Sequence, residues 1–310
     1  MSWFYEALMR AEGNPAQPGQ AAVAGEEKDG DSFLGEIEGL AGVLTSKPRA
    51  EACPGPAGAA EHLPQRPREA VASNGFRHVR AVFREESRLV FHSDPRGMAA
   101  EQFRLLRRSL VQAFPRGGVL MVTSPGPGDG KTLTAMNLCA SLADAGESTL
   151  LVELDLRRPS AQKVFGCKIG GPGVETVLRG DEKPEQAPCY IEELGFHAAL
   201  VAEVPSEPSR LLGSNTLADL LSWARNRFRW VVLDTAPVLP NADVAELLPA
   251  VDAVLLVARV QVTPRELLRR ACEVLGKRLH GVVLNEATIS STPYYRYLSD
   301  YYHPGAAKPS

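Results

Sequence analysis

The sequence predicts an α/β fold in which a mostly parallel sheet is covered by helices on both faces. Short, almost purely apolar segments alternate along the chain with longer segments that have the periodicity of amphipathic helices. Parallel strands are buried on both faces and therefore read as continuous apolar runs. A glycine-rich turn and three acidic residues follow such runs, at the strand ends where parallel sheets bind ligands.

The strands and helices are expected to alternate from about residue 87 onward. The expected strands lie at 119–123, 149–153, 198–201, 230–234, 253–258 and 281–284. The expected helices lie at 98–114, 131–145, 210–226, 242–248 and 264–277, with short helical turns near Ala161 and Val174. Thr263, Pro264 and Glu266 match a capping box with proline in the first helical turn, and this predicts where the last helix begins.

Composition excludes several classes of protein. The chain has 310 residues, of which 44% are hydrophobic, enough for a sizeable core. A net charge of -3 without a basic tract argues against general binding to nucleic acid. Five cysteines without a CxxC pair indicate neither a zinc site nor a disulfide framework. Because no apolar run approaches the ~20 residues of a membrane span, and no signal peptide is evident, a cytoplasmic protein is expected.

The N-terminal part differs from the rest. Residues 13 to about 75 are rich in Gly, Ala, Pro and Glu, which predicts that residues 1–85 form a largely disordered arm. At its tip, MSWFYEALMRAE places Trp3, Phe4 and Leu8 on one side of a possible short helix, either a docking peptide or a terminus without function. We expect a folded domain over 86–290 and a tyrosine-rich tail over 291–310.

The stretch TSPGPGDGKTLTAMNLC at 123–139 indicates phosphate binding. Gly126, Gly128 and Gly130 allow a tight turn whose N–H groups point at an anion, and the following helix adds its positive N-terminal dipole. Lys131 would reach the β- and γ-phosphates, and the Thr132 hydroxyl would hold Mg²⁺. The pattern G-x-x-x-x-G-K-[ST] is met except for a proline at its first position. We term residues 124–132 the phosphate loop, and the predicted fold is that of a P-loop NTPase.

Acidic residues end two of the expected strands. LLVELDLRRP carries Glu153 and Asp155, and WVVLDTAP carries Asp234. A single acidic residue after a strand is often a helix cap, but three in a domain with a phosphate loop favour a metal and a nucleotide. We expect the three carboxylates to converge on the metal of the phosphate loop.

Segments 123–132, 150–159 and 231–237, together with the C-terminal tyrosines, resemble the bacterial tyrosine kinases (BY-kinases) of the CpsD/CapB-like kind that accompany capsule and exopolysaccharide export. In that family the three segments are the Walker A, Walker A′ and Walker B motifs. The resemblance covers about 87–302 and not the arm. It implies an ATP-dependent protein-tyrosine autokinase that regulates the biosynthesis and export of such polysaccharides.

The resemblance also implies roles for individual residues. Lys131, Glu153, Asp155 and Asp234 would be catalytic, and Thr132 and Asp155 would coordinate Mg²⁺, with Asp234 supporting the metal through water. The nucleotide would be held by Gly126, Gly128, Asp129, Gly130, Lys131, Thr132, Leu133 and Asn285. The family usually has aspartate as the proton acceptor where this chain has Glu153, and a displacement of ~1 Å in a catalytic group can cost ~100-fold in rate. Asn285 would contact adenine, or alternatively would only end a strand in a turn.

Two more features match the family. Glu101, Arg104 and Arg107 fit its E-x-x-R-x-x-R motif and imply contact with the next subunit of a homo-oligomeric ring; a solvated helix face is the alternative. The tail STPYYRYLSDYYHP would hold the autophosphorylation sites, namely Tyr294, Tyr295, Tyr297, Tyr301 and Tyr302. A packed segment with two or three buried tyrosines is the alternative.

The expected partner is a membrane-bound polysaccharide co-polymerase that activates the kinase and recruits it to the inner face of the membrane. Two other functions remain open. One is a non-catalytic, ATP-binding regulator of polysaccharide export. The other is a ParA/MinD-like ATPase, although Gly126 stands where such proteins typically carry a second lysine.

Overall fold

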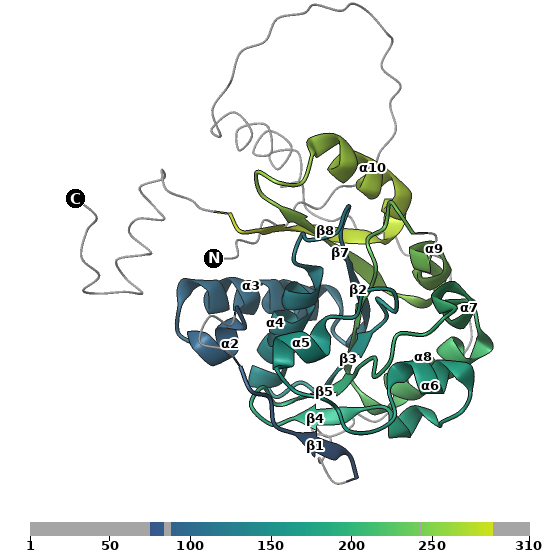
Figure 1. The fold of residues 1–310 in the computed structure, drawn as a ribbon. Helices are drawn as coiled ribbons and strands as arrows, with labels where there is room; N and C mark the ends of the chain where they lie inside the picture. The colour runs from purple at the N-terminus through teal and green to yellow at the C-terminus, as the bar shows by residue number, and fades with distance from the viewer. Residues whose placement is uncertain (1–74, 84–87, 242, 288–310) are drawn as a thin grey trace, which may run out of the picture. The chain divides into compact units, whose positions relative to one another are not determined.

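The computed structural model describes residues 75–83, 88–241 and 243–287 (Figure 1). Within these residues the strands form one sheet in the order β1-β4-β5-β3-β6-β2-β7-β8. All neighbouring strands pair in parallel except β4 and β5, which are antiparallel. The strands are β1 (Arg77–Val79), β2 (Gly118–Thr123), β3 (Thr149–Glu153), β4 (Cys189–Ile191), β5 (Phe196–Ala199), β6 (Trp230–Asp234), β7 (Ala253–Arg259) and β8 (Leu279–Asn285).

The helices cover both faces of the sheet, which confirms the predicted fold class (Figure 1). One face packs against α2 (Val90–Ser93), α3 (Met98–Ala113), α4 (Lys131–Asp144) and α5 (Ala161–Phe165). The other packs against α6 (Val174–Arg179), α7 (Pro208–Leu212), α8 (Asn215–Arg227), α9 (Asp243–Leu247) and α10 (Arg265–Leu275). Short 3₁₀ turns lie at Pro184–Gln186, Leu248–Ala250 and Gly276–Arg278.

The strand β2 shows why the apolar runs predicted this arrangement. Val119 and Met121 belong to the core on one face, whereas Leu120 and Val122 belong to the core on the other. All four side chains are fully buried. Because successive side chains of a strand point to opposite faces, a strand covered on both faces needs apolar residues at every position.

The edge of the sheet differs most from prediction. β1 lies inside the range predicted to be a disordered arm, so the folded part of the chain begins before residue 86. The strand expected at 198–201 is β5, which begins two residues earlier because its first residue already pairs with β4, through Ile191↔Phe196. Neither β1 nor β4 was predicted, since three residues give little periodicity. The remainder of the arm and the tail at 291–310 lie outside the described residues.

Two helix predictions were wrong in detail. The helix expected at 210–226 is two helices, because Gly213 ends α7 and Ser214 precedes α8. The capping box at the start of α10 does not form, since the N-cap is Pro264 and makes no side-chain cap. The Thr263 hydroxyl instead donates to Asp129 Oδ1 at 2.7 Å. Across the described segments, no helix combines the length and the apolar character that crossing a bilayer requires.

Candidate functional site

The phosphate loop connects β2 to α4 and has the open backbone predicted for anion binding. Gly128 and Gly130 adopt the left-handed region, with φ of 86° and 93°, which side chains other than glycine rarely tolerate. The backbone N–H groups of residues 128–130 donate to no acceptor within the described segments. These amides precede α4, whose N-terminus adds positive potential. The loop therefore offers unpaired donors to an anion.

The order of the strands brings the acidic residues next to this loop. β2 lies beside β6, and β6 lies beside β3, all in parallel. Asp234 is in register with Val122 on one side and with Glu153 on the other. Carboxyl ends of parallel strands meet at one edge of a sheet, so the ends of β3 and β6 and the start of the phosphate loop lie together.

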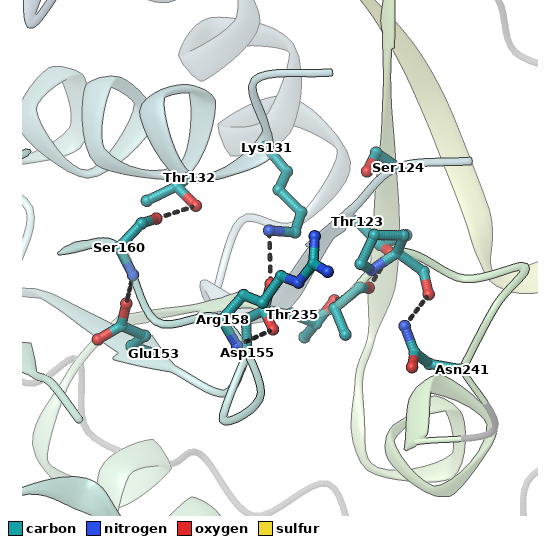
Figure 2. A network of polar contacts seen from close by, with 12 residues as sticks. Thr123, Ser124, Lys131, Thr132, Glu153, Asp155, Arg158, Ser160, Thr235 and Asn241 are labelled. Carbon is teal, nitrogen blue, oxygen red and sulfur yellow. Dashed lines mark hydrogen bonds and ion pairs between the residues drawn. The ribbon is translucent and has the colours of Figure 1, made fainter. Parts of the chain in front are cut away.

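Lys131 and Asp155 form an ion pair at the centre of the site (Figure 2). Lys131 Nζ lies 2.7 Å from Asp155 Oδ2, and the two side chains are only 13% and 6% exposed. Burial by itself would lower the pKa of Lys131, but the charges of Asp234 and Asp155, the hydrogen bond to Asp155 and the charge of Glu153 together raise it. Lys131 therefore carries a positive charge, and a bound phosphate could replace Asp155 as its ion-pair partner.

Asp234 is a buried carboxylate without a hydrogen-bond partner. It is 1% exposed, and neither carboxylate oxygen makes a hydrogen bond of normal geometry in the described part of the chain. Burial raises its pKa to about 7, although the charge of Lys131 and the nearby Thr132 hydroxyl oppose the rise. Such a group is costly unless it meets a cation or water. Unpartnered carboxylate oxygens beside a phosphate loop therefore fit a hydrated Mg²⁺.

The segment after β6 is tied to β2, which fixes the position of Asp234. The Thr235 amide donates to the Val122 carbonyl at 3.1 Å. The Thr123 hydroxyl donates to the Ala236 carbonyl at 2.8 Å, and Figure 2 shows Thr123 beside Thr235. The Val238 amide donates to the Ser124 carbonyl at 2.9 Å. The end of β6 and the start of the phosphate loop are thus held as one unit.

The prediction that three carboxylates converge on a metal is wrong for Glu153, whose carboxylate is engaged by backbone amides. Its Oε1 accepts hydrogen bonds from the amides of Ser160 and Ala161 at 2.7 and 2.8 Å, and its Oε2 accepts one from Val201 at 3.0 Å. Burial raises its pKa, while these amides act in the opposite direction. No set of three His, Cys, Asp or Glu side chains in the described segments is placed to hold a metal alone. Asp155, Asp234 and the Thr132 hydroxyl remain as the groups the site offers, and Mg²⁺ commonly uses one or two carboxylates together with phosphates and waters.

Ser160 belongs to the site but was not predicted. Its hydroxyl donates to Thr132 Oγ1 at 3.2 Å (Figure 2). Arg157 pairs with the buried Asp243 at 2.8 Å and donates to the Ser209 hydroxyl at 2.6 Å, and these contacts were not predicted either. None of these three contacts has a signal in the sequence, because the partners are separated by 28 to 86 residues.

Asn285 holds the phosphate loop from the other side. Its amide nitrogen donates to the Asp129 carbonyl at 3.0 Å, and its amide oxygen accepts from the Glu286 amide at 3.0 Å. The Asp129 side chain accepts hydrogen bonds from Thr263 and from the Gly126 amide. Contact of Asn285 with adenine stays a prediction. Of the other nucleotide-binding candidates, Leu133 lies in the first turn of α4 and is partly buried against the core.

The E-x-x-R-x-x-R residues make contacts within the chain. Arg104 pairs with Glu101 and with Asp144 at the end of α4, and Arg107 donates to the Ser141 carbonyl and lies 3.7 Å from Asp144. Their side chains are 20–33% exposed. The structure thus places all three in one half-buried network between α3 and α4, and their contact with another subunit stays a prediction. The five tail tyrosines lie outside the described residues.

Comparison with known proteins identifies relatives of this fold and site. No family model matches the sequence. A putative tyrosine-protein kinase of the cps region of Klebsiella pneumoniae is 32% identical over 220 residues, which cover 68% of this chain and 30% of that relative. The chain therefore spans less than a third of the length of that protein.

Solved structures of bacterial tyrosine kinase domains are also similar to this chain. The kinase domain of the Escherichia coli tyrosine kinase ETK superposes with a TM-score of 0.62 at 29% identity, covering 66% of this chain and 83% of that domain. The kinase domain of VpsO is 32% identical with a TM-score of 0.53, covering 62% of this chain and 100% of that domain. With its phosphate loop, acidic strand ends and these relatives, the chain belongs to the bacterial tyrosine kinase family.

Proposed function

We propose that the protein is an ATP- and Mg²⁺-dependent protein-tyrosine autokinase that regulates capsule or exopolysaccharide biosynthesis and export. The observation that carries this proposal is the pairing of Lys131 with Asp155 beside the open phosphate loop and the unpartnered Asp234. The names of its relatives, which include a putative tyrosine-protein kinase in a cps region, support the reaction and the setting.

The chain's own residues would supply positioning and charge. The amides of the phosphate loop and the Lys131 ammonium would hold the β- and γ-phosphates, and Thr132, Asp155 and Asp234 would hold Mg²⁺. The metal, when bound, neutralises charge on the transferring phosphoryl group. Phosphoryl transfer depends mainly on alignment and electrostatic stabilisation, so a site of preorganised donors with little exposure to water suits it.

The partners and location belong to the same proposal. We place the protein in the cytoplasm at the inner face of the membrane, recruited by a membrane-bound co-polymerase that activates it. Tyr294, Tyr295, Tyr297, Tyr301 and Tyr302 would be phosphorylated by a neighbouring subunit of a homo-oligomer, and Glu101, Arg104 and Arg107 would contribute to that interface. The support is the family membership and the clustering of five tyrosines in one short segment.

The test is to incubate the purified protein, with its co-polymerase segment supplied, with ATP and Mg²⁺ and to map phosphate by mass spectrometry. Phosphate on the tail tyrosines is expected, and Lys131→Met should abolish it. Lys168→Met is the matched control, because Lys168 is exposed and lies outside the site, and it should change nothing. ATP hydrolysis without phosphotyrosine would contradict the proposal and favour a ParA/MinD-like ATPase.

One observation favours a second function. Because all three hydrogen bonds of Glu153 go to backbone amides, the residue at the usual position of the proton acceptor is engaged elsewhere. A non-catalytic regulator that binds ATP would need only the phosphate loop and the metal ligands. In the experiment above, tight Mg²⁺-dependent ATP binding with neither hydrolysis nor phosphotyrosine would identify this function.

A further inference from the structure

We propose that Glu153 is a positioning residue that shapes the metal-binding loop after β3, and that it does not accept the proton of the substrate hydroxyl. This inference rests on the proposed nucleotide site and deepens it. We term residues 154–160 the A′ loop, which runs from the end of β3 to the start of α5 and carries Asp155.

The Glu153 carboxylate connects the two ends of the A′ loop. Glu153 is the last residue of β3, and its Oε1 accepts hydrogen bonds from Ser160 and Ala161, seven and eight residues later, at 2.7 and 2.8 Å. The first amides of the same loop, those of Leu154 and Asp155, donate to the Asp234 carbonyl at 2.7 and 3.1 Å. Both ends of the loop are therefore fixed, one by β6 and the other by Glu153.

The second carboxylate oxygen links the loop to the sheet. Glu153 Oε2 accepts a hydrogen bond at 3.0 Å from the amide of Val201, which lies just after β5. One side chain thus joins the ends of β3 and β5 and the start of α5. Since Glu153 is only 1% exposed, water competes little for these hydrogen bonds, and they are stronger than they would be at the surface.

Glu153 reaches the metal ligands through Ser160 and Asp155. Ser160, whose amide is held by Glu153, donates its hydroxyl to Thr132 Oγ1 at 3.2 Å. In Figure 2 the Glu153 carboxylate lies beside the Ser160 amide, while Asp155 extends to Lys131. Two of the candidate metal ligands, Thr132 and Asp155, are therefore oriented by a loop that Glu153 holds. Groups that orient metal ligands in this way typically contribute 10–100-fold to metal affinity.

The same contacts argue against a role as proton acceptor. A general base must lie within about 2.6–3.2 Å of the proton it removes, directly or through one water. Both oxygens of Glu153 are already occupied by amides, and the residue is 1% exposed. Three of the four acceptor sites of this buried carboxylate are taken, so a substrate hydroxyl could reach it only if the side chain moved, gave up bonds that shape the A′ loop and disturbed Asp155.

The length of the side chain discriminates the two roles. Aspartate is shorter by one methylene, about 1.5 Å, and from the same backbone position it cannot reach the amides of both α5 and the segment after β5. If Glu153 positions the loop, Glu153→Asp damages the site, although aspartate is the residue usual in the family. If Glu153 is the proton acceptor, the same change improves the kinase.

The experiment compares Glu153→Asp and Glu153→Gln with Glu175→Gln. Glu175 is the matched control because it is equally buried and accepts two backbone hydrogen bonds, from Ala202 and Glu203, neither of which belongs to the phosphate loop or the A′ loop. For each protein, the melting temperature is measured without nucleotide, and the ATP affinity is measured at 25 °C with Mg²⁺ and with EDTA. Phosphotyrosine formation is measured separately.

Both Glu153 variants are expected to melt at lower temperature and to bind ATP with Mg²⁺ roughly tenfold more weakly, while their affinity for ATP in EDTA changes less than about twofold. Glu175→Gln should lower the melting temperature alone. The inference is overturned if Glu153→Asp keeps the melting temperature and Mg²⁺-dependent affinity, or forms phosphotyrosine faster. It is equally overturned if the Glu153 variants lose stability but keep that affinity. Binding and melting decide the matter even if the native protein forms no phosphotyrosine, an outcome that would count against the proposed function alone.

Discussion

The phosphate loop is held between two regions that contact it in different ways. On the acidic side, at the ends of β3 and β6, Lys131 pairs with Asp155, and the Asp234 carboxylate makes no hydrogen bond of normal geometry to any described residue. On the polar side, at the ends of β7 and β8, Asn285 and Thr263 both donate to Asp129. The acidic side presents groups that a ligand can engage, whereas the polar side has satisfied its groups with the loop itself. The acidic side is therefore suited to binding a ligand, and the polar side to fixing the conformation of the phosphate loop.

The packing of the polar side explains why it can hold the loop. A Cβ atom on Gly130 would come within 2.0 Å of the side-chain nitrogen, Nδ2, of Asn285. The loop and the end of β8 therefore touch with no room for a side chain between them. The acidic side has no comparable backbone contact with residues 128–130 in the described segments.

The largest effect is expected from Lys131→Met. The change removes the cation of the acidic side and leaves the buried Asp155 carboxylate unpaired, so we expect roughly 100-fold weaker ATP binding with or without Mg²⁺. Isothermal titration calorimetry measures this directly, with Lys168→Met as the control. Equal affinity in Lys131→Met and the native protein would show that the acidic side does not bind the phosphates.

Asp234→Asn should change stability and ATP binding in opposite directions: the melting temperature should rise, and the affinity for ATP with Mg²⁺ should fall. The pKa of Asp234 is raised to about 7, so between about pH 4 and 7 the folded protein keeps a proton that the unfolded chain releases. Stability contributed by this group is present at low pH and is lost as the pH rises through 7. At pH 8, asparagine removes the buried charge, and we expect the nucleotide-free variant to melt about 2–4 °C higher than the native protein.

The same variant should bind ATP with Mg²⁺ roughly tenfold more weakly, because a carboxylate near the metal is lost. The gain in melting temperature should shrink between pH 8 and pH 5, as the native carboxylate becomes protonated. Thermal melts at four pH values, with the exposed Asp181→Asn as a control, measure this. A melting temperature that falls equally at all pH values would contradict the conclusion that burial of the Asp234 carboxylate destabilises the nucleotide-free protein.

The smallest effect is expected on the polar side, from Asn285→Ala. Loss of one neutral hydrogen bond to the Asp129 carbonyl costs about 1 kcal/mol, or roughly fivefold in ATP affinity if the loop must be reordered on binding. Because no metal ligand is touched, the loss should be the same in Mg²⁺ and in EDTA. Asn226→Ala, on the exposed end of α8, is the control. If Asn285→Ala lost ATP affinity only in the presence of Mg²⁺, the polar side would also act on the metal, which would contradict the distinction between the two sides.

Most of the central sheet could be predicted from the sequence, for a physical reason. The strands β2, β3, β6 and β7 are buried on both faces, so each is a continuous apolar run. The edge was harder, because β1 and β4 have three residues each and their pairing depends on β5. Strand identity there is decided by tertiary contacts and leaves little trace in local sequence.

The site shows the same limit at the level of side chains. The positions of Lys131, Asp155 and Asp234 followed from motif spacing, since each stands at a loop or strand end whose place in a parallel sheet is fixed. The direction of the Glu153 side chain could not be predicted, because it depends on the amides of Ser160 and Val201. Sequence gives the residue at a strand end, but only the fold gives the partners that it meets.

The measurement that tests the central claim most directly is ATP binding by calorimetry in Mg²⁺ and in EDTA, for the native protein and for Asp155→Asn, with Asp181→Asn as a control. If Mg²⁺ and a triphosphate bind between the phosphate loop and the acidic side, Mg²⁺ should tighten binding to the native protein by about tenfold or more, and Asp155→Asn should lose that gain. Equal affinity of the native protein in Mg²⁺ and EDTA, or a full Mg²⁺ response in Asp155→Asn, would contradict the account.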